Sequence, residues 1–149
     1  METFATEAEE SKRVGQWISD RVAAGVHPHE IGLIIRSPGQ LDRALAAVQG
    51  AGHKAKALDE QLEASTGFVS ICTMHSAKGL EFRAVAVLAC DDEIVPLQER
   101  IEAVGDGADL QEVYDTERHL LYVACTRARD ELLVTAVEPG SEFLTDLNT

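Results

Sequence analysis

Residues that could bind phosphate gather in two short stretches of this chain, Thr73–Phe82 and Glu117–Arg129. The first stretch places two hydroxyls, an imidazole and an amine close together, and all of them are suitable hydrogen-bond donors to phosphate oxygens. They belong to Thr73, His75, Ser76 and Lys78. The second stretch contains Arg127, whose forked guanidinium can neutralise charge that builds on phosphoryl oxygens with a geometry that lysine lacks.

Glu81 and Gly79 complete the first stretch. A carboxylate such as Glu81 can accept hydrogen bonds from ribose hydroxyls, although in isolation it would be read as a surface residue. Gly79 can supply a backbone shape that other residues resist. Plain structural roles are the alternative: Thr73 or His75 can tie a loop internally, and an arginine such as Arg127 can favour the C-terminal dipole of a helix.

Both stretches resemble motifs of one helicase family. Residues 73–82 read T-M-H-S-A-K-G-L-E-F, and residues 117–129 read E-R-H-L-L-Y-V-A-C-T-R-A-R. They resemble motifs V and VI of superfamily 1 DNA helicases of the UvrD/Rep/PcrA and RecB kind, in the family's order. Ile31–Ser37, followed by a helical pattern and Gly52-His-Lys-Ala, looks like the segment that opens the same domain, so the resemblance covers about residues 7–137.

The resemblance implies an ATP-contacting set. Arg127 would be the catalytic arginine that reaches across a cleft to the γ-phosphate, while Glu81 and Gly79 would lie near the rest of the nucleotide. Arg36 resembles a position near the same cleft, and a salt bridge at the end of its strand is the alternative. Glu117 and Arg118, at the start of the second motif, would orient the helix and Arg127.

The resemblance also implies a path for nucleic acid. The loop that carries Thr73, His75, Ser76 and Lys78 follows a strand, which is where open α/β sheets place their ligands. In the family this loop contacts the backbone of single-stranded DNA and communicates with the ATP cleft. The sequence supports such backbone contact more than reading of bases, because it has few aromatic residues for stacking.

One expected element is missing. No G-x-x-x-x-G-K-[ST] sequence occurs, so the chain has no P-loop to cradle the β- and γ-phosphates. We therefore expect residues 1–149 to be a single C-terminal RecA-like domain, a fragment of an ATP-dependent DNA helicase. ATP and Mg²⁺ would be bound mainly by an upstream P-loop domain, and the fragment alone should not hydrolyse ATP. The large domain that UvrD and Rep insert is expected to be absent, since residues 58–68 leave room only for a loop.

Apolar periodicity predicts alternating helices and strands. Helices are expected over residues 7–24, 41–50 and 110–128, with a short one starting at Ser141, and strands over 31–35, 54–58, 68–73, 83–90 and 131–137. This alternation predicts an α/β fold with a mostly parallel, doubly wound RecA-like sheet flanked by helices.

Charge and cysteine usage narrow the class further. The net charge is −13, and residues 91–117 hold ten acidic residues against one basic residue, Arg100, which predicts a solvated face held away from DNA. Cys72, Cys90 and Cys125 form no C-x-x-C pair and are expected to be buried, reduced thiols. Residues 85–93 resemble a Walker B strand with acidic metal ligands, but without a P-loop we reject a metal site. A cytoplasmic location without membrane contact is expected.

Three other functions stay open. The first is a helicase-like module that binds DNA or a partner without turnover. The second is a helicase joined to a nuclease, as in RecB-like proteins. The third, a small hydrolase using His75 and Cys72, lacks any compelling triad spacing.

Overall fold

The structure, a computed structural model, describes residues 1–58, 66–105 and 107–148. Within these ranges, six strands form one wholly parallel sheet in the order β1-β6-β5-β2-β4-β3. The strands are β1 (Glu2–Phe4), β2 (Ile31–Ile35), β3 (Lys54–Ala57), β4 (Phe68–Thr73), β5 (Phe82–Val87) and β6 (Ala128–Val137). The predicted α/β class is confirmed. The expected loop at residues 58–68 falls largely on residues 59–65, which lie outside the described ranges.

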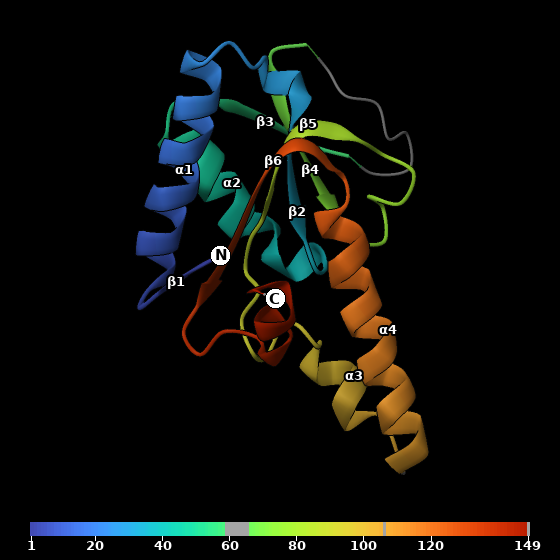
Figure 1. Ribbon diagram of the computed structural model, residues 1–149. Helices are drawn as coiled ribbons and strands as arrows, with labels where there is room; N and C mark the ends of the chain where they lie inside the picture. Colours follow the sequence, from blue (N-terminus) through green and yellow to red (C-terminus); the bar gives the residue numbers. More distant parts are fainter. Residues whose placement is uncertain (59–65, 106, 149) are drawn as a thin grey trace.

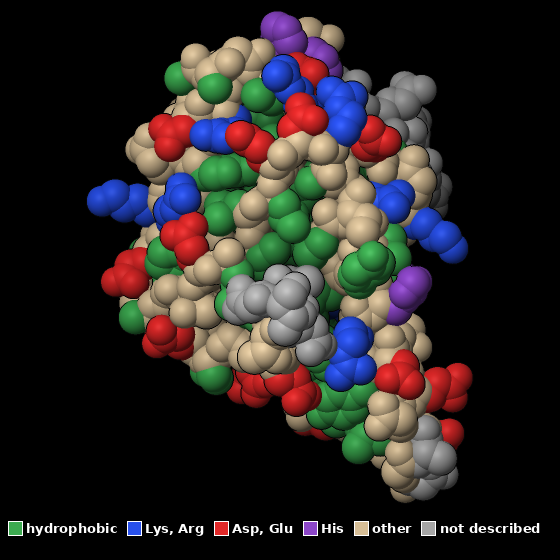
Figure 2. Space-filling model, in the orientation of Figure 1, with side chains coloured by type: hydrophobic (Ala, Val, Ile, Leu, Met, Phe, Trp, Pro, Cys, Tyr) green, Lys and Arg blue, Asp and Glu red, His purple; other side chains and the backbone are tan. Residues whose placement is uncertain are grey.

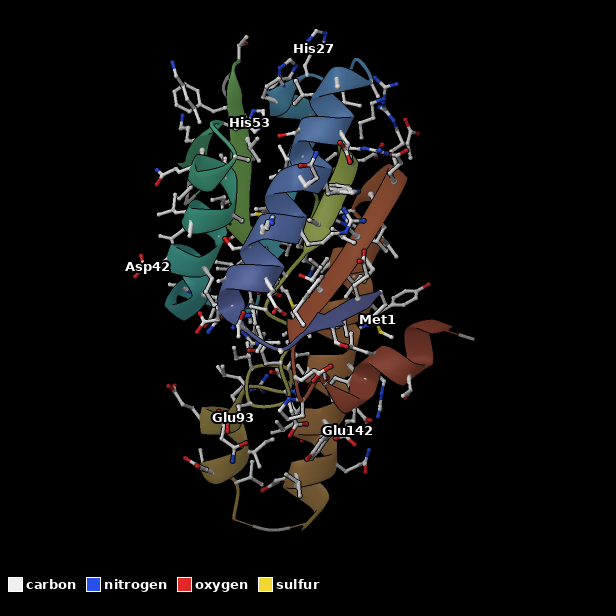
Figure 3. The ribbon with its side chains drawn as sticks, turned by 90° about the vertical axis from the view of Figure 1, so that its left-hand side faces the viewer. Met1, His27, Asp42, His53, Glu93 and Glu142 are labelled. Atoms are coloured by element: carbon white, nitrogen blue, oxygen red, sulfur yellow. The ribbon has the colours of Figure 1, made fainter. Side chains whose placement is uncertain are left out.

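Helices cover both faces of the sheet. On one face α1 (Glu7–Ala23) and α2 (Leu41–Gly50) lie side by side (Figures 1 and 3). On the other face lies α4 (Gly107–Cys125), which packs through Leu121 and Ala124. The shorter helices are η1 (Pro28–Glu30), η2 (Pro38–Gln40), α3 (Gln98–Glu102) and η3 (Glu142–Asn148). None of the helices in the described ranges has the length and hydrophobicity that a membrane crossing requires.

The start of α1 shows how local sequence fixes an element. The Thr6 hydroxyl accepts a hydrogen bond from the Glu9 backbone N–H at 3.2 Å, and the Glu9 carboxylate accepts one from the Ala5 N–H at 3.2 Å. The first bond satisfies a backbone donor of the first turn, and the second fixes the residue that precedes the N-cap Thr6. Farther along, Gly15 lets α1 approach α2 so closely that an added Cβ would lie 2.8 Å from the Ala47 carbonyl oxygen.

Four short elements, β1, η1, η2 and α3, were not predicted, and several boundaries differ. The strand expected over residues 83–90 is β5 and ends at Val87, because Ala89 takes a positive φ of 59°. The helix expected from residue 110 begins at Gly107. The three residues of β1 and the five of α3 are too few to show a periodic pattern. The helix α4 ends at Cys125 rather than at residue 128, and β6 already begins at Ala128. The reason lies in strand pairing: the Phe82 N–H donates to the Arg127 carbonyl at 2.9 Å, and Ala128 pairs with Phe82. Arg127 therefore stands in the turn between helix and strand.

The parallel strands give the sheet two distinct edges. At the carboxyl edge β2 ends at Ile35 and β4 at Thr73, which are paired; at the amino edge β5 begins at Phe82 and β6 at Ala128, also paired. In Figure 1 the amino edge lies at the top, and α4 extends downward past the carboxyl edge with α3 beside it. Figure 3 separates the same two ends, with His27 above and Glu93 below.

The acidic segment forms the projecting part of the molecule. Most of its described acidic residues are exposed along α3 and the first half of α4, and Figure 2 shows acidic side chains gathered at this lower end. That agrees with the predicted solvated face. Two members differ: Glu117 is fully buried, and Asp91 is half-buried in an ion pair with Arg43.

Candidate functional site

At the carboxyl edge, one group of the predicted residues surrounds a cavity of about 330 Å³. Because Ile35 pairs with Thr73, the residues that follow β2 and β4 must lie together. Its lining combines apolar residues, which include Ile71 and Leu41, with polar ones. The polar lining residues are Arg36, Ser37, Thr73, His75 and Ser76.

The loop after β4 is held by its own hydrogen bonds. The Thr73 hydroxyl donates to the Ser76 hydroxyl at 3.1 Å and accepts from the Ser76 N–H at 3.1 Å. The Ala77 N–H donates to the Thr73 carbonyl at 2.9 Å. The hydroxyls of Thr73 and Ser76 are thus partly used within the loop, and for Thr73 this is the internal role given above as the alternative to ligand contact. His75 and Lys78 are exposed.

Arg36 is buried in an ion pair. Its Nε and one terminal nitrogen donate to the two carboxylate oxygens of Glu117 at 2.9 and 2.7 Å, and only 4% of Arg36 is exposed. The salt bridge that the sequence left as the alternative is therefore present. Arg36 also lies at the carboxyl edge, with Thr73 and His75, and at the opposite edge from Arg127. The structure thus separates Arg36 from the other residues of the predicted ATP-contacting set.

The ion pair shapes the protonation of its surroundings. Partial desolvation and then the positive charge of Arg36 lower the pKa of His75, so its imidazole is neutral at neutral pH. Burial alone would raise the pKa of Glu117, but hydrogen bonds from Arg36 and the Leu97 N–H outweigh it and lower that pKa. Glu117 is consequently a carboxylate, and His75 can act as a hydrogen-bonding group rather than as a charge.

At the amino edge, Arg127 is held against the end of the first stretch. Its Nε donates to the Val123 carbonyl at 3.2 Å, and its terminal nitrogens donate to the Leu80 carbonyl at 3.3 Å and to the Thr126 hydroxyl at 3.2 Å. A guanidinium has five N–H donors. Two N–H groups of Arg127 therefore have no protein partner within the described ranges, and the side chain is half-buried.

Glu81 and Gly79 belong to this amino-edge cluster. Glu81 is exposed and stands between Leu80 and Phe82, both of which bond to Arg127. Gly79 has φ +86°, a conformation that other residues rarely adopt, so the expectation of a special backbone shape is confirmed. The predicted site residues thus form two groups, Gly79, Glu81 and Arg127 at one edge and Arg36, Thr73, His75 and Ser76 at the other. Lys78 lies in the connection between them, where its N–H donates to the His75 carbonyl at 3.5 Å.

A second buried charge network was not predicted. Glu10, 1% exposed, accepts hydrogen bonds from Arg43 at 2.6 Å, from the Ala89 N–H at 2.9 Å and from the Thr135 hydroxyl at 2.9 Å. Arg43 also pairs with Asp91 at 2.7 Å. Asp91, the first acidic residue of the Walker B-like sequence, thus forms an ion pair with Arg43. The sequence held a usable signal, because Glu10 lies on the stripe of Val14 and Ile18 that faces the core.

The cysteines are all free, and Cys72 and Cys90 are buried while Cys125 is half-buried. Desolvation raises the pKa of Cys72 to about 12 and that of Cys125 to about 11. Such thiols are poor nucleophiles at neutral pH. The burial of Cys72 and Cys90 agrees with their predicted place in the core, whereas Cys125 is only half-buried. Cys72 is therefore unsuited to pair with His75 in catalysis.

Comparisons of the sequence with a family model and with curated proteins agree on one family. Residues 53–139 match the family described as the UvrD-like helicase C-terminal domain. The chain is 39% identical over 100 residues to the ATP-dependent DNA helicase UvrD1 of Mycobacterium leprae, a match that covers 60% of this chain and 12% of that protein. It is 42% identical over 67 residues to the ATP-dependent DNA helicase PcrA of Staphylococcus aureus, covering 45% of this chain and 8% of that protein.

A solved structure has a similar fold. The C-terminal domain of a possible DNA helicase from Lactobacillus plantarum WCFS1 superposes with a TM-score of 0.69 at 21% identity, covering 95% of this chain and 75% of that one. The curated relatives are much longer than this chain, which spans 12% of one and 8% of the other.

Proposed function

Because this chain belongs to the UvrD-like helicase C-terminal domain family, we propose that it is the second RecA-like domain of an ATP-dependent DNA helicase. It would work beside a P-loop domain of the same protein, with ATP between the two and single-stranded DNA along the loop after β4. ATP would supply the phosphoryl group that is transferred to water. This chain would supply an arginine at one edge of its sheet and nucleic-acid contacts at the other.

The observation that carries this proposal is the connection between β4 and β5. It starts at the carboxyl edge with Thr73 and His75, and it ends at the amino edge with Glu81, next to Arg127. One short segment thus borders both groups of candidate residues. Such an arrangement suits a motor domain, in which contact with a strand at one edge must affect chemistry at the other.

Arg127 would act as an arginine finger. The bonds to Leu80, Val123 and Thr126 fix the guanidinium plane, so little conformational entropy remains to be lost when it meets a phosphate. Its two remaining N–H groups can donate to phosphoryl oxygens as negative charge builds on them. Glu81 could accept hydrogen bonds from the ribose hydroxyls of the same nucleotide.

His75 and Lys78 would contact the DNA backbone. Both are exposed, and Lys78 adds the positive charge that phosphate binding requires. Thr73 and Ser76 would share their hydroxyls between the loop and a phosphate oxygen, since a hydroxyl can donate and accept at once. The surplus of acidic residues on α3 and α4 would keep the strand on the loop side.

Mg²⁺ would be held by the P-loop domain. Within the described ranges, no three His, Cys, Asp or Glu side chains gather in a way that could hold a metal ion. Exposed apolar side chains suggest where that domain would dock: Tyr122 is 62% exposed and Leu132 44%, and they lie five residues before and five after Arg127. Covering them would bury apolar area around the arginine.

ATP hydrolysis by the complete protein, with and without an oligo-dT strand, tests the proposal. Arg127→Ala should lower the stimulated rate by about 10³-fold, the effect of losing an arginine finger. Arg129→Ala is the matched control, because Arg129 is 58% exposed and its nearest carboxylate, on Asp130, is 3.9 Å away; its rate should stay near that of wild type. An Arg127→Ala protein as active as wild type would remove Arg127 from the site. A complete protein without ATPase activity would leave the DNA- or partner-binding module as the function.

A further inference from the structure

Glu117 is the most heavily bonded carboxylate among the described residues, and its partners come from three different segments. One oxygen accepts from Arg36 Nε at 2.9 Å and from the Leu97 N–H at 2.7 Å. The other accepts from Arg36 at 2.7 Å and from Arg100 at 2.9 Å. All four lone-pair sites of the carboxylate are thereby used, and the side chain is fully buried.

These bonds attach α4 to the carboxyl edge. Arg36 lines the cavity beside His75, Leu97 belongs to the segment that follows β5, and Arg100 belongs to α3. Glu117 lies in α4 itself, eight residues before the end of the helix at Cys125. The cavity, the acidic projection and α4 are thus joined at one side chain.

The other end of α4 leads to Arg127. Glu117 and Cys125, the last residue of α4, are eight positions apart, which corresponds to roughly 12 Å along a helix, and Arg127 follows in the next turn. Between them Leu121 and Ala124, 1% and 0% exposed, seat the helix on the sheet. A displacement of the helix at Glu117 must therefore be carried toward the turn that holds Arg127, because a packed helix moves as a rigid element.

The buried Arg36–Glu117 pair matters more for the position of α4 than for the stability of the domain. An apolar pair of the same volume often stabilises a domain as well as a buried ion pair does. Four directional bonds, however, fix the position of the helix in a way that apolar contacts cannot, since Arg36 meets Glu117 with two parallel bonds.

We infer that Glu117 is a positioning residue that couples the occupancy of the loop after β4 to the placement of Arg127, with α4 as the rigid connection. This inference rests on the proposed function. In the unbound domain the Arg36–Glu117 pair fixes α4. A phosphate on the His75 side of Arg36 would compete with Glu117 for hydrogen bonds from the same guanidinium. DNA binding would thus alter the attachment of the helix that leads to Arg127.

The test compares two carboxylates shortened by one methylene in the complete protein. Glu117→Asp keeps the buried negative charge but cannot reach all of its donors at once. Glu10→Asp is the matched control, because Glu10 is equally buried and also pairs with an arginine, but it lies on α1. The readout is the ratio of the ATPase rate at saturating oligo-dT to the rate without DNA, together with KM for ATP.

We expect Glu117→Asp to lower the stimulation ratio at least tenfold, because a displacement of about 1 Å in catalytic geometry can cost about 10²-fold. Its KM for ATP should remain within about twofold of wild type, because the shortened side chain does not contact the nucleotide. Glu10→Asp should keep the wild-type ratio. Arg36→Lys, which retains the charge but loses the paired bonds, should lower the ratio similarly, and the double variant with Glu117→Asp should be no worse than either single one.

Each other result has a defined meaning. If wild type shows no DNA-stimulated hydrolysis, the proposed function fails. If wild type is stimulated and folded Glu117→Asp or Arg36→Lys is stimulated equally, the positioning role is overturned. An equal loss in Glu10→Asp would also overturn it, because the effect would then be a general loosening of the domain. Should Glu117→Asp not fold, Arg36→Lys alone decides.

Discussion

The contact between Gly32 and Phe82 gives the sharpest test of the packing. Gly32 lies in the buried strand β2, and a Cβ added to it would lie 2.5 Å from Cδ2 of the Phe82 ring. Ordinary contact begins at 3.4 Å, so in Gly32→Ala the ring would have to retreat by about 0.9 Å. Overpacking of this kind costs roughly 1–3 kcal/mol, which the better strand propensity of alanine offsets by roughly 0.5–1 kcal/mol. The net expected loss is about 1 kcal/mol, within a range of about 0–2.5 kcal/mol.

A double-mutant cycle isolates that contact. Phe82→Ala alone should cost about 3–5 kcal/mol, because it empties a buried ring site. In the double variant the new methyl of residue 32 enters the vacated space, so the loss should be at least about 1 kcal/mol smaller than the sum of the single losses. Urea unfolding of the 149-residue chain, followed by circular dichroism, measures all four proteins. Strict additivity would show that the methyl and the ring do not meet, and would refute the reasoning.

Three further predictions concern the same chain. Gly50→Ala should stabilise the chain by up to about 1 kcal/mol, because the added Cβ meets nothing within 4 Å. Gly15→Ala should destabilise it, because the added Cβ would lie 2.8 Å from a carbonyl oxygen. Melting temperatures that shift in the same direction for both variants would contradict this. Cys72, with a pKa of about 12, should react with a thiol reagent at pH 8 only as fast as the domain opens, and a burst of labelling in the native protein would argue against its burial. The folded pKa of Glu117 is lowered, so this carboxylate stabilises the fold above about pH 4.5 and loses that contribution as the pH falls through the folded value. In Glu117→Gln the free energy of unfolding should therefore fall less steeply between neutral and acid pH, as measured by unfolding titrations. An unchanged fall would assign the acid sensitivity to other carboxylates.

Much of the architecture could be predicted, because buried parallel strands are read directly as short apolar runs. The strand at residues 31–35 agrees with β2 at both ends. The position of Arg127 could not be read, since the helical pattern continues through residue 128 and only pairing with β5 ends it. The partner of Arg36 lies 81 positions away, in a segment whose composition suggested solvent. Ion pairs between distant residues leave no periodic pattern in the sequence. The division of the candidate site between the two edges of the sheet could therefore be seen only in the fold.

The connection between β4 and β5 is short, and this limits how the domain can vary. Parallel strands are usually joined by a dozen or more residues that include a helix, whereas only residues 74–81 join these two. The chain must travel roughly 20 Å back along the sheet and roughly 10 Å across β2, a straight distance of about 22 Å, while this segment can span at most about 30 Å. Part of that span is taken up by turns, because the Ala77 N–H donates to the Thr73 carbonyl and the Leu80 N–H donates to the Ala77 carbonyl. A deletion here would have to open one of these turns before Phe82 could keep its bond to the Arg127 carbonyl. In a library of insertions and deletions, this segment should tolerate changes of residue type but not of length, unlike a surface loop.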